Sequence, residues 1–161
     1  MSVESPPRLI LIVTGSTLRA EELDRPLAYY LKQQVETAVG RRVEDGTDEA
    51  PAKVLVVADF RWMSDEPLQA AATISVGGPG VNALAHRWFE ELPFSFAVDE
   101  QYCIQMDPDL AEPRVSLWGM DNPTTQIAVS IFVERYLPRF LDRAAVPPPE
   151  SDDDDDEPDD D

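Results

Sequence analysis

Cysteine and histidine are almost missing from this sequence, with one residue of each among 161. A lone cysteine cannot form an internal disulfide, which is typical of chains that work in a reducing compartment. Tyr102, Ile104 and Met106 surround Cys103 in a pattern that indicates a strand, so we expect a buried structural thiol in preference to a catalytic one. His86 lies beside the apolar stripe of a predicted helix, and no Gly-x-Ser-x-Gly motif occurs. We therefore expect neither a metal site nor a serine triad.

Long apolar runs are also missing. The run from Leu9 to Val13 is far shorter than the roughly 20 residues of a membrane span. The first residues, MSVESPPR, lack the cationic segment with which a signal peptide begins. These features favour a cytoplasmic protein that does not bind membranes.

Positive charge is scarce, since 13 lysines and arginines face 32 acidic residues and give a net charge of −19. Ten of the acidic residues lie between Glu150 and Asp161, which leaves −9 on residues 1–149. Such a surface repels the phosphates of nucleic acids and anionic lipids, so we expect no nucleic-acid partner. A local basic pocket stays open, because five arginines lie in the first third of the chain: Arg8, Arg19, Arg25, Arg41 and Arg42.

The composition divides the chain into three parts. Residues 146–161 are mainly proline and acidic residues, which cannot bury apolar surface, so we expect a disordered acidic tail. Residues 1–7 predict a flexible lead-in, and residues 8–145 a single α/β domain. Solubility would explain the tail, and so would docking to a basic protein partner or mimicry of nucleic-acid charge.

Short apolar runs alternate with helical patterns along the domain. The runs typical of strands buried on both faces are residues 9–13, 53–58 and 73–76. Residues 94–98 and 102–106 predict a short antiparallel hairpin, and 102–106 could also pair with 114–118. This alternation predicts an α/β three-layer sandwich with a mostly parallel central sheet, either flavodoxin-like or Rossmann-like.

Three helices are expected between and after these strands. The first covers residues 27–38, starts near Asp24 or earlier with a cap at Ser16 or Thr17, and ends at Gly40. The second covers residues 81–92. The third follows Asn122 as its N-cap and ends near Pro138 or Leu141. Trp62 is predicted in a loop, where it could line a pocket or contact a partner.

Two polar loops follow predicted parallel strands, and a strand order of 2-1-3 would make them neighbours. Ligands of open α/β sheets bind beyond the carboxyl ends of strands, where the strand order reverses. The first loop offers hydroxyls, a glycine and a nearby cation, and the second offers glycine amides at a helix start. The expected ligand-binding residues are Thr14, Gly15, Ser16, Thr17, Arg19, Gly77, Gly78 and Asn82. The alternative is structural, with a helix cap in the first loop and a tight turn in the second.

Two carboxylates also end predicted strands. Asp59 and Asp121 are candidate catalytic residues, because paired carboxylates can exchange protons. For both residues a structural role is favoured, as a cap or loop carboxylate at Asp59 and as a turn and cap residue at Asp121.

One segment resembles a known family. Residues 74–82, ISVGGPGVN, resemble the strand–GGPxxN–helix segment of archaeal surface-layer proteins, and residues 119–129 are similar to a second segment there. Those proteins are exported, whereas this sequence shows no export signal, so the resemblance implies a local turn and no surface role. As a whole the sequence is similar to bacterial Rossmann-like or flavodoxin-like α/β domains, which implies a fold and no activity.

Two hypotheses for function follow. The first is a cytoplasmic α/β module that binds a partner protein or a small ligand without catalysis, because no complete catalytic constellation is visible. The second is a domain that binds an anionic small molecule, namely a nucleotide or phosphometabolite, or an enzyme acting on a nucleotide. In the second hypothesis Ser16, Arg19, Gly78 and Asn82 surround the anion.

Overall fold

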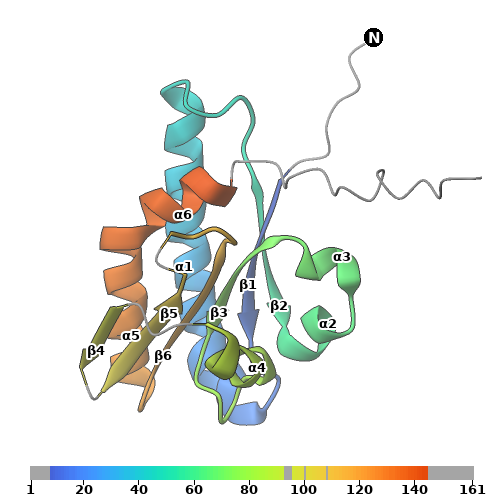
Figure 1. Ribbon diagram of the computed structural model, residues 1–161, viewed down its shortest axis with the longest axis vertical. Helices are drawn as coiled ribbons and strands as arrows, with labels where there is room; N and C mark the ends of the chain where they lie inside the picture. Colours follow the sequence, from blue (N-terminus) through green and yellow to red (C-terminus); the bar gives the residue numbers. More distant parts are fainter. Residues whose placement is uncertain (1–7, 93–95, 100, 108, 145–161) are drawn as a thin grey trace, which may run out of the picture.

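The computed structural model describes residues 8–92, 96–99, 101–107 and 109–144 (Figure 1). In this part of the chain six strands form a sheet in the order β2-β1-β3-β6-β5-β4. Their bounds are β1 Leu9–Thr14, β2 Lys53–Ala58, β3 Ala72–Val76, β4 Phe96–Asp99, β5 Tyr102–Met106 and β6 Arg114–Gly119. Strands β2, β1, β3 and β6 run parallel, whereas β5 is antiparallel to both β6 and β4. The predicted fold class and the hairpin are confirmed, and the observed order contains the 2-1-3 arrangement that makes the two polar loops neighbours.

Helices cover both faces of the sheet (Figure 1). One face carries α1 (Leu18–Glu44), α5 (Asn122–Ile131), a π-helical turn (Phe132–Tyr136) and α6 (Leu137–Ala144). The other face carries α2 (Asp59–Met63), α3 (Glu66–Gln69) and α4 (Ala83–Glu91). Among the described residues, no helix has the length and apolar character needed to cross a membrane. The predicted lead-in and acidic tail lie outside the described residues. The basic partner expected for the tail stays a prediction.

Strand β1 divides the core into two apolar clusters. Ile10 and Ile12 pack with α1, α5 and α6, whereas Leu11 and Val13 pack with α2 and α4. In the second cluster the rings of Trp62 and Trp88 meet edge to face, with centroids 5.7 Å apart. Burying both faces of a strand explains why its sequence is an unbroken apolar run.

The prediction that Trp62 lies in a loop, lining a pocket or contacting a partner, is wrong. Trp62 belongs to α2, is 4% exposed, and donates its indole N–H to Thr73 Oγ1 at 3.2 Å. Helix α2 is only five residues long and buries only Asp59 and Trp62, so its sequence shows no repeated apolar pattern. The ring therefore cannot line an open pocket.

The predicted alternative of an early start for the first helix, with Thr17 as its cap, is confirmed, whereas two other predicted helix boundaries are wrong. Helix α1 begins at Leu18, where Thr17 accepts a hydrogen bond from the backbone N–H of Ala20 at 3.2 Å. The helix continues through Gly40, so the prediction that this glycine ends the helix is wrong. The last helix is capped by Asp121, not by Asn122 as predicted.

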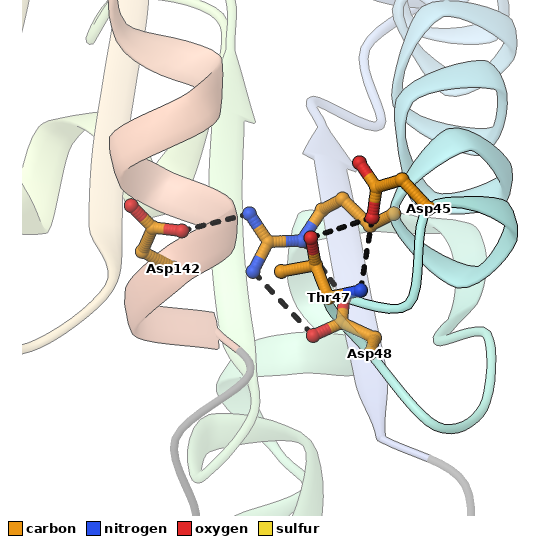
Figure 2. A network of polar contacts seen from close by, with 5 residues as sticks. Asp45, Thr47, Asp48 and Asp142 are labelled. Carbon is orange, nitrogen blue, oxygen red and sulfur yellow. Dashed lines mark hydrogen bonds and ion pairs between the residues drawn. The ribbon is translucent and has the colours of Figure 1, made fainter.

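A polar network holds the extended end of α1 (Figure 2). The Arg42 guanidinium donates to Asp48 through Nε at 2.8 Å and to Asp142 of α6 through Nη1 at 2.7 Å. Hydrogen bonding to Asp48 raises the pKa of Arg42 further above its ordinary value. In the loop, Thr47 donates its N–H and its hydroxyl to Asp45 Oδ1, which lowers the pKa of Asp45. The network ties α1, the following loop and α6 together, so α1 gains contacts beyond Gly40.

Gly40→Ala tests the assignment of Gly40 to a helix interior. A Cβ at this position would meet no atom within 4 Å. Alanine has the higher helix propensity, so we expect the free energy of unfolding to rise by about 0.5–1 kcal/mol. Urea unfolding followed by circular dichroism measures the change, and a clear loss of stability would contradict an interior position.

Arg42→Met tests the network at the end of α1. Arg42 and Asp48 are only 16% and 14% exposed, so the variant leaves a half-buried carboxylate without its partner. We expect a loss of about 1–2 kcal/mol in the free energy of unfolding. Arg41→Met is the matched control at an exposed site and should change stability by less than about 0.5 kcal/mol. Equal effects of the two variants would show that the network adds nothing.

Candidate functional site

The two loops expected to hold a ligand lie side by side, as predicted, but they touch. Strand β1 pairs with β3, which places Gly15 against the backbone of Val81. A Cβ on Gly15 would overlap the carbonyl oxygen of Val81. The contact leaves no opening for a ligand between the loops at this point.

The Asp59 carboxylate fills the neighbouring space. Asp59 is 5% exposed, and its Oδ1 accepts hydrogen bonds from Ser16 Oγ at 2.6 Å and the N–H of Phe60 at 2.7 Å. Its Oδ2 accepts from the N–H of Ala83 at 2.8 Å, in the first turn of α4. Free amides at a helix start attract anions, and here the protein supplies its own anion.

The remaining polar residues of these loops are also occupied by internal contacts. Asn82 is 1% exposed, donates to the carbonyl oxygens of Val13 and Val76, and accepts from two N–H groups of α4. Thr14 is 3% exposed, and Thr17 caps α1. Gly77 has a φ of 110° and turns the chain out of β3. These contacts explain the loop residues without a ligand.

The structure does not bring Asp59 and Asp121 together. Strands β1 and β3 lie between β2 and β6, so the two residues are three strand spacings apart, roughly 14 Å. Asp121 caps α5, and hydrogen bonds from the N–H and the hydroxyl of Thr124 lower the pKa of its carboxyl. The pair does not form an acid–base site.

Other reactive side chains are inert or isolated. Cys103 is 4% exposed, and burial raises the pKa of its thiol to about 12, so it stays protonated at neutral pH. His86 is exposed on α4. Among the described residues, no group of three or more histidine, cysteine, aspartate or glutamate side chains could hold a metal ion.

An open cleft of about 250 Å³ lies one strand further along the same sheet edge, and we call it the Trp118 cleft. Strand β3 leads to α4 on one face and β6 leads to α5 on the other, so their loops diverge. The start of α1 forms the third wall. The cleft contains three of the predicted residues, Arg19, Gly78 and Asp121. Its other main lining residues are Leu23, Asp24, Val81, Trp118, Met120 and Asn122.

Asp24 is the group in the Trp118 cleft that the sequence analysis missed. It is 8% exposed, and the described residues give its carboxyl no hydrogen bond and no ion pair. Burial raises the pKa of Asp24 from 3.8 to about 6, against an opposing effect of the Arg19 charge. A signal was present, because Asp24 lies three and four residues before the buried Leu27 and Ala28 and so on the inward stripe of the helix.

Comparison with known proteins adds no identity. No family model matches the sequence, and no curated protein sequence is found similar to it. The fold and the Trp118 cleft define an α/β three-layer sandwich with an opening at the carboxyl edge of its parallel strands.

Asp24→Asn tests whether the burial of the Asp24 carboxyl lowers the free energy of unfolding at neutral pH. A raised pKa in the folded state means that stability is fully present below about pH 4 and falls as the pH rises through 6. Asparagine mimics the protonated form, so at about pH 7.5 the variant should be more stable by about 1–3 kcal/mol. Near pH 4 the two proteins should match. Urea unfolding at both pH values measures this, and an equal or lower stability of the variant at pH 7.5 would contradict it.

Proposed function

We propose that this protein is a binding module for a small organic anion, and that the ligand occupies the Trp118 cleft. The observation that supports this is the position of the cleft, at the carboxyl edge of β3 and β6, where the connections leave on opposite faces. The proposal moves the ligand away from the gap between residues 14–17 and 77–82, which Asp59 and Val81 fill.

The size and lining of the cleft favour a compact molecule with an apolar body. A volume of about 250 Å³ is slightly below the usual range of ligand pockets, roughly 300–1,000 Å³. Leu23 and Met120 are 41% and 74% exposed beside the half-buried Trp118 ring. Exposed apolar side chains around a concave site favour a ligand that buries them.

The ring that would support the ligand is held in place. Trp118 donates its indole N–H to Gln105 Oε1 at 3.2 Å, and Gln105 donates to two backbone carbonyl oxygens of the α4 region. Asn122 donates to the carbonyl oxygen of Leu23 at 2.8 Å, which joins α5 to α1 across the cleft. A preorganised wall lowers the entropy lost on binding.

Arg19 supplies the positive charge for an anionic group. Its side chain is exposed at the cleft, in the first turns of α1, where the helix amides also favour negative charge. The chain as a whole has a net charge of −19, and Arg19 is the one positively charged residue among those that line the cleft. A small carboxylate or phosphate ester is therefore the favoured ligand class.

Binding is favoured over catalysis by the state of the polar groups near the cleft. Thr125, the hydroxyl in the lining, is 3% exposed and bonded to the backbone of Gly119 and Asp121. The Asp121 carboxylate is held by Thr124. Of the carboxylates and hydroxyls that line the cleft, Asp24 alone has no hydrogen bond to another described residue.

Gly78→Leu tests the proposed function. A Cβ at Gly78 would make ordinary contact with Trp118 Cε3 at 3.7 Å, so the fold accepts a side chain that then fills the cleft. Small carboxylates and phosphate esters with aromatic or aliphatic bodies are screened by ¹H–¹⁵N correlation spectra. We expect shifts at Arg19, Gly78 and the Trp118 indole, and affinity at least about tenfold weaker in the variant.

Gly40→Leu is the matched control, because it adds the same side chain in open space, away from the lining residues. It should bind as the wild type does. Shifts confined to residues outside the cleft, or equal binding by Gly78→Leu, would overturn the proposal.

A further inference from the structure

We propose that the ligand of the Trp118 cleft also carries a protonated amine, which pairs with Asp24, so that the ligand is a small amphoteric molecule. This inference rests on the proposed function and adds the class of ligand. The observation behind it is the carboxyl group of Asp24, a residue that is only 8% exposed: this group lines the cleft and has no hydrogen bond or ion pair among the described residues.

A buried carboxylate without a donor is costly. Leaving a buried charged group unpaired costs more than leaving a neutral one, and native proteins usually satisfy such groups. Asp24 nevertheless occupies this position, although an apolar residue would continue the inward stripe of α1. A donor that arrives with the ligand would remove the cost on binding.

The backbone is shaped to admit this carboxyl. A Cβ on Gly77 would lie 2.7 Å from Asp24 Oδ2, and the φ of 110° at Gly77 disfavours other residues. The loop from Gly77 therefore approaches the carboxylate closely without bonding to it. This close approach fixes the carboxyl at the wall of the cleft.

Few charged groups compete for Asp24. Among the cleft-lining residues the others with charge are Arg19, on the same helix, and Asp121, in the loop between β6 and α5. The loop from Gly78 to Val81 contributes none. Arg19 lies outside ion-pair distance of Asp24, and Asp121 is engaged by Thr124. Burial raises the pKa of Asp24 to about 6, so the carboxyl is mostly ionised at neutral pH and can attract an ammonium group.

The two charges of α1 select for opposite charges on one molecule. A ligand with only an amine would be repelled by Arg19, and a ligand with only an acid would be repelled by ionised Asp24. An ammonium near Asp24 and an anionic group near Arg19 satisfy both. The apolar body then lies against Trp118.

The test uses three compounds with the same aromatic body: phenylalanine, phenethylamine and 3-phenylpropionate. Isothermal titration calorimetry on the full chain measures each at about pH 5 and pH 7.5. We expect phenylalanine to bind tightest, and to bind about tenfold tighter at the higher pH because Asp24 is then ionised. 3-Phenylpropionate should show no such gain.

Asp24→Asn should weaken phenylalanine binding at pH 7.5 by at least about tenfold and remove its pH dependence. Glu22→Gln is the matched control, since it removes an exposed carboxylate from the same helix and should leave binding and its pH dependence unchanged. Unfolding curves recorded for both variants show whether they are folded under these conditions.

Two outcomes would overturn the inference in different ways. If 3-phenylpropionate binds best, and its binding is lost in Gly78→Leu and kept in Asp24→Asn, the amine is excluded and the proposed function stands. If none of the three compounds binds and the small anions also fail to shift the residues of the cleft, both proposals fall together.

Discussion

The carboxylate of Asp59 holds the carboxyl edge of the sheet together. It joins the loop after β1, the start of α2 and the start of α4 through three hydrogen bonds of 2.6–2.8 Å. The side chain comes from the end of β2, and its partners come from chain segments that follow β1 and β3. Three connections are thereby fixed relative to one another. The Asp59 carboxylate also supplies the negative charge that the first turn of α4 favours.

Because of this arrangement, the open part of the carboxyl edge lies between β3 and β6 and not between β1 and β3. The gap between β1 and β3 is closed by Asp59 and by the contact of Gly15 with Val81. The next gap, between β3 and β6, is open: a hydrogen bond to Gln105 holds the Trp118 ring at the wall of the cleft, and Asp121 is bound to its own helix. The chain thus concentrates its internal polar contacts at one gap and leaves its unpartnered carboxyl, Asp24, at the other. The hydrogen-bonded gap and the proposed ligand site are separated by a single strand, β3.

The strands could be predicted from the sequence, because a strand that is buried on both faces requires an unbroken apolar run, as in Leu9–Thr14. The sequence was also sufficient for the adjacency of residues 14–17 and 77–82, which follows from parallel pairing of β1 and β3. The contents of the gap could not be deduced, because the bonds of Asp59 to Ser16 and Ala83 span 43 and 24 residues. Gly40 was wrongly predicted to end the helix, because the contact that holds the helix beyond it joins Arg42 to Asp142, which is 100 residues away in the sequence. Asp24 was readable as an acid on an apolar stripe, but only once α1 was known to begin at Leu18.

The polar network at Arg42 lies at the far end of α1 from the cleft, which Arg19, Leu23 and Asp24 line near the start of that helix. There Arg8, before β1, and Ala144, at the end of α6, line the same shallow depression beside Asp48. The first and last parts of the described domain are therefore neighbours in space. A short peptide could join them, and new termini could be opened at Ala70, the exposed residue that follows α3, giving a circular permutant in which the cleft faces away from any attached protein.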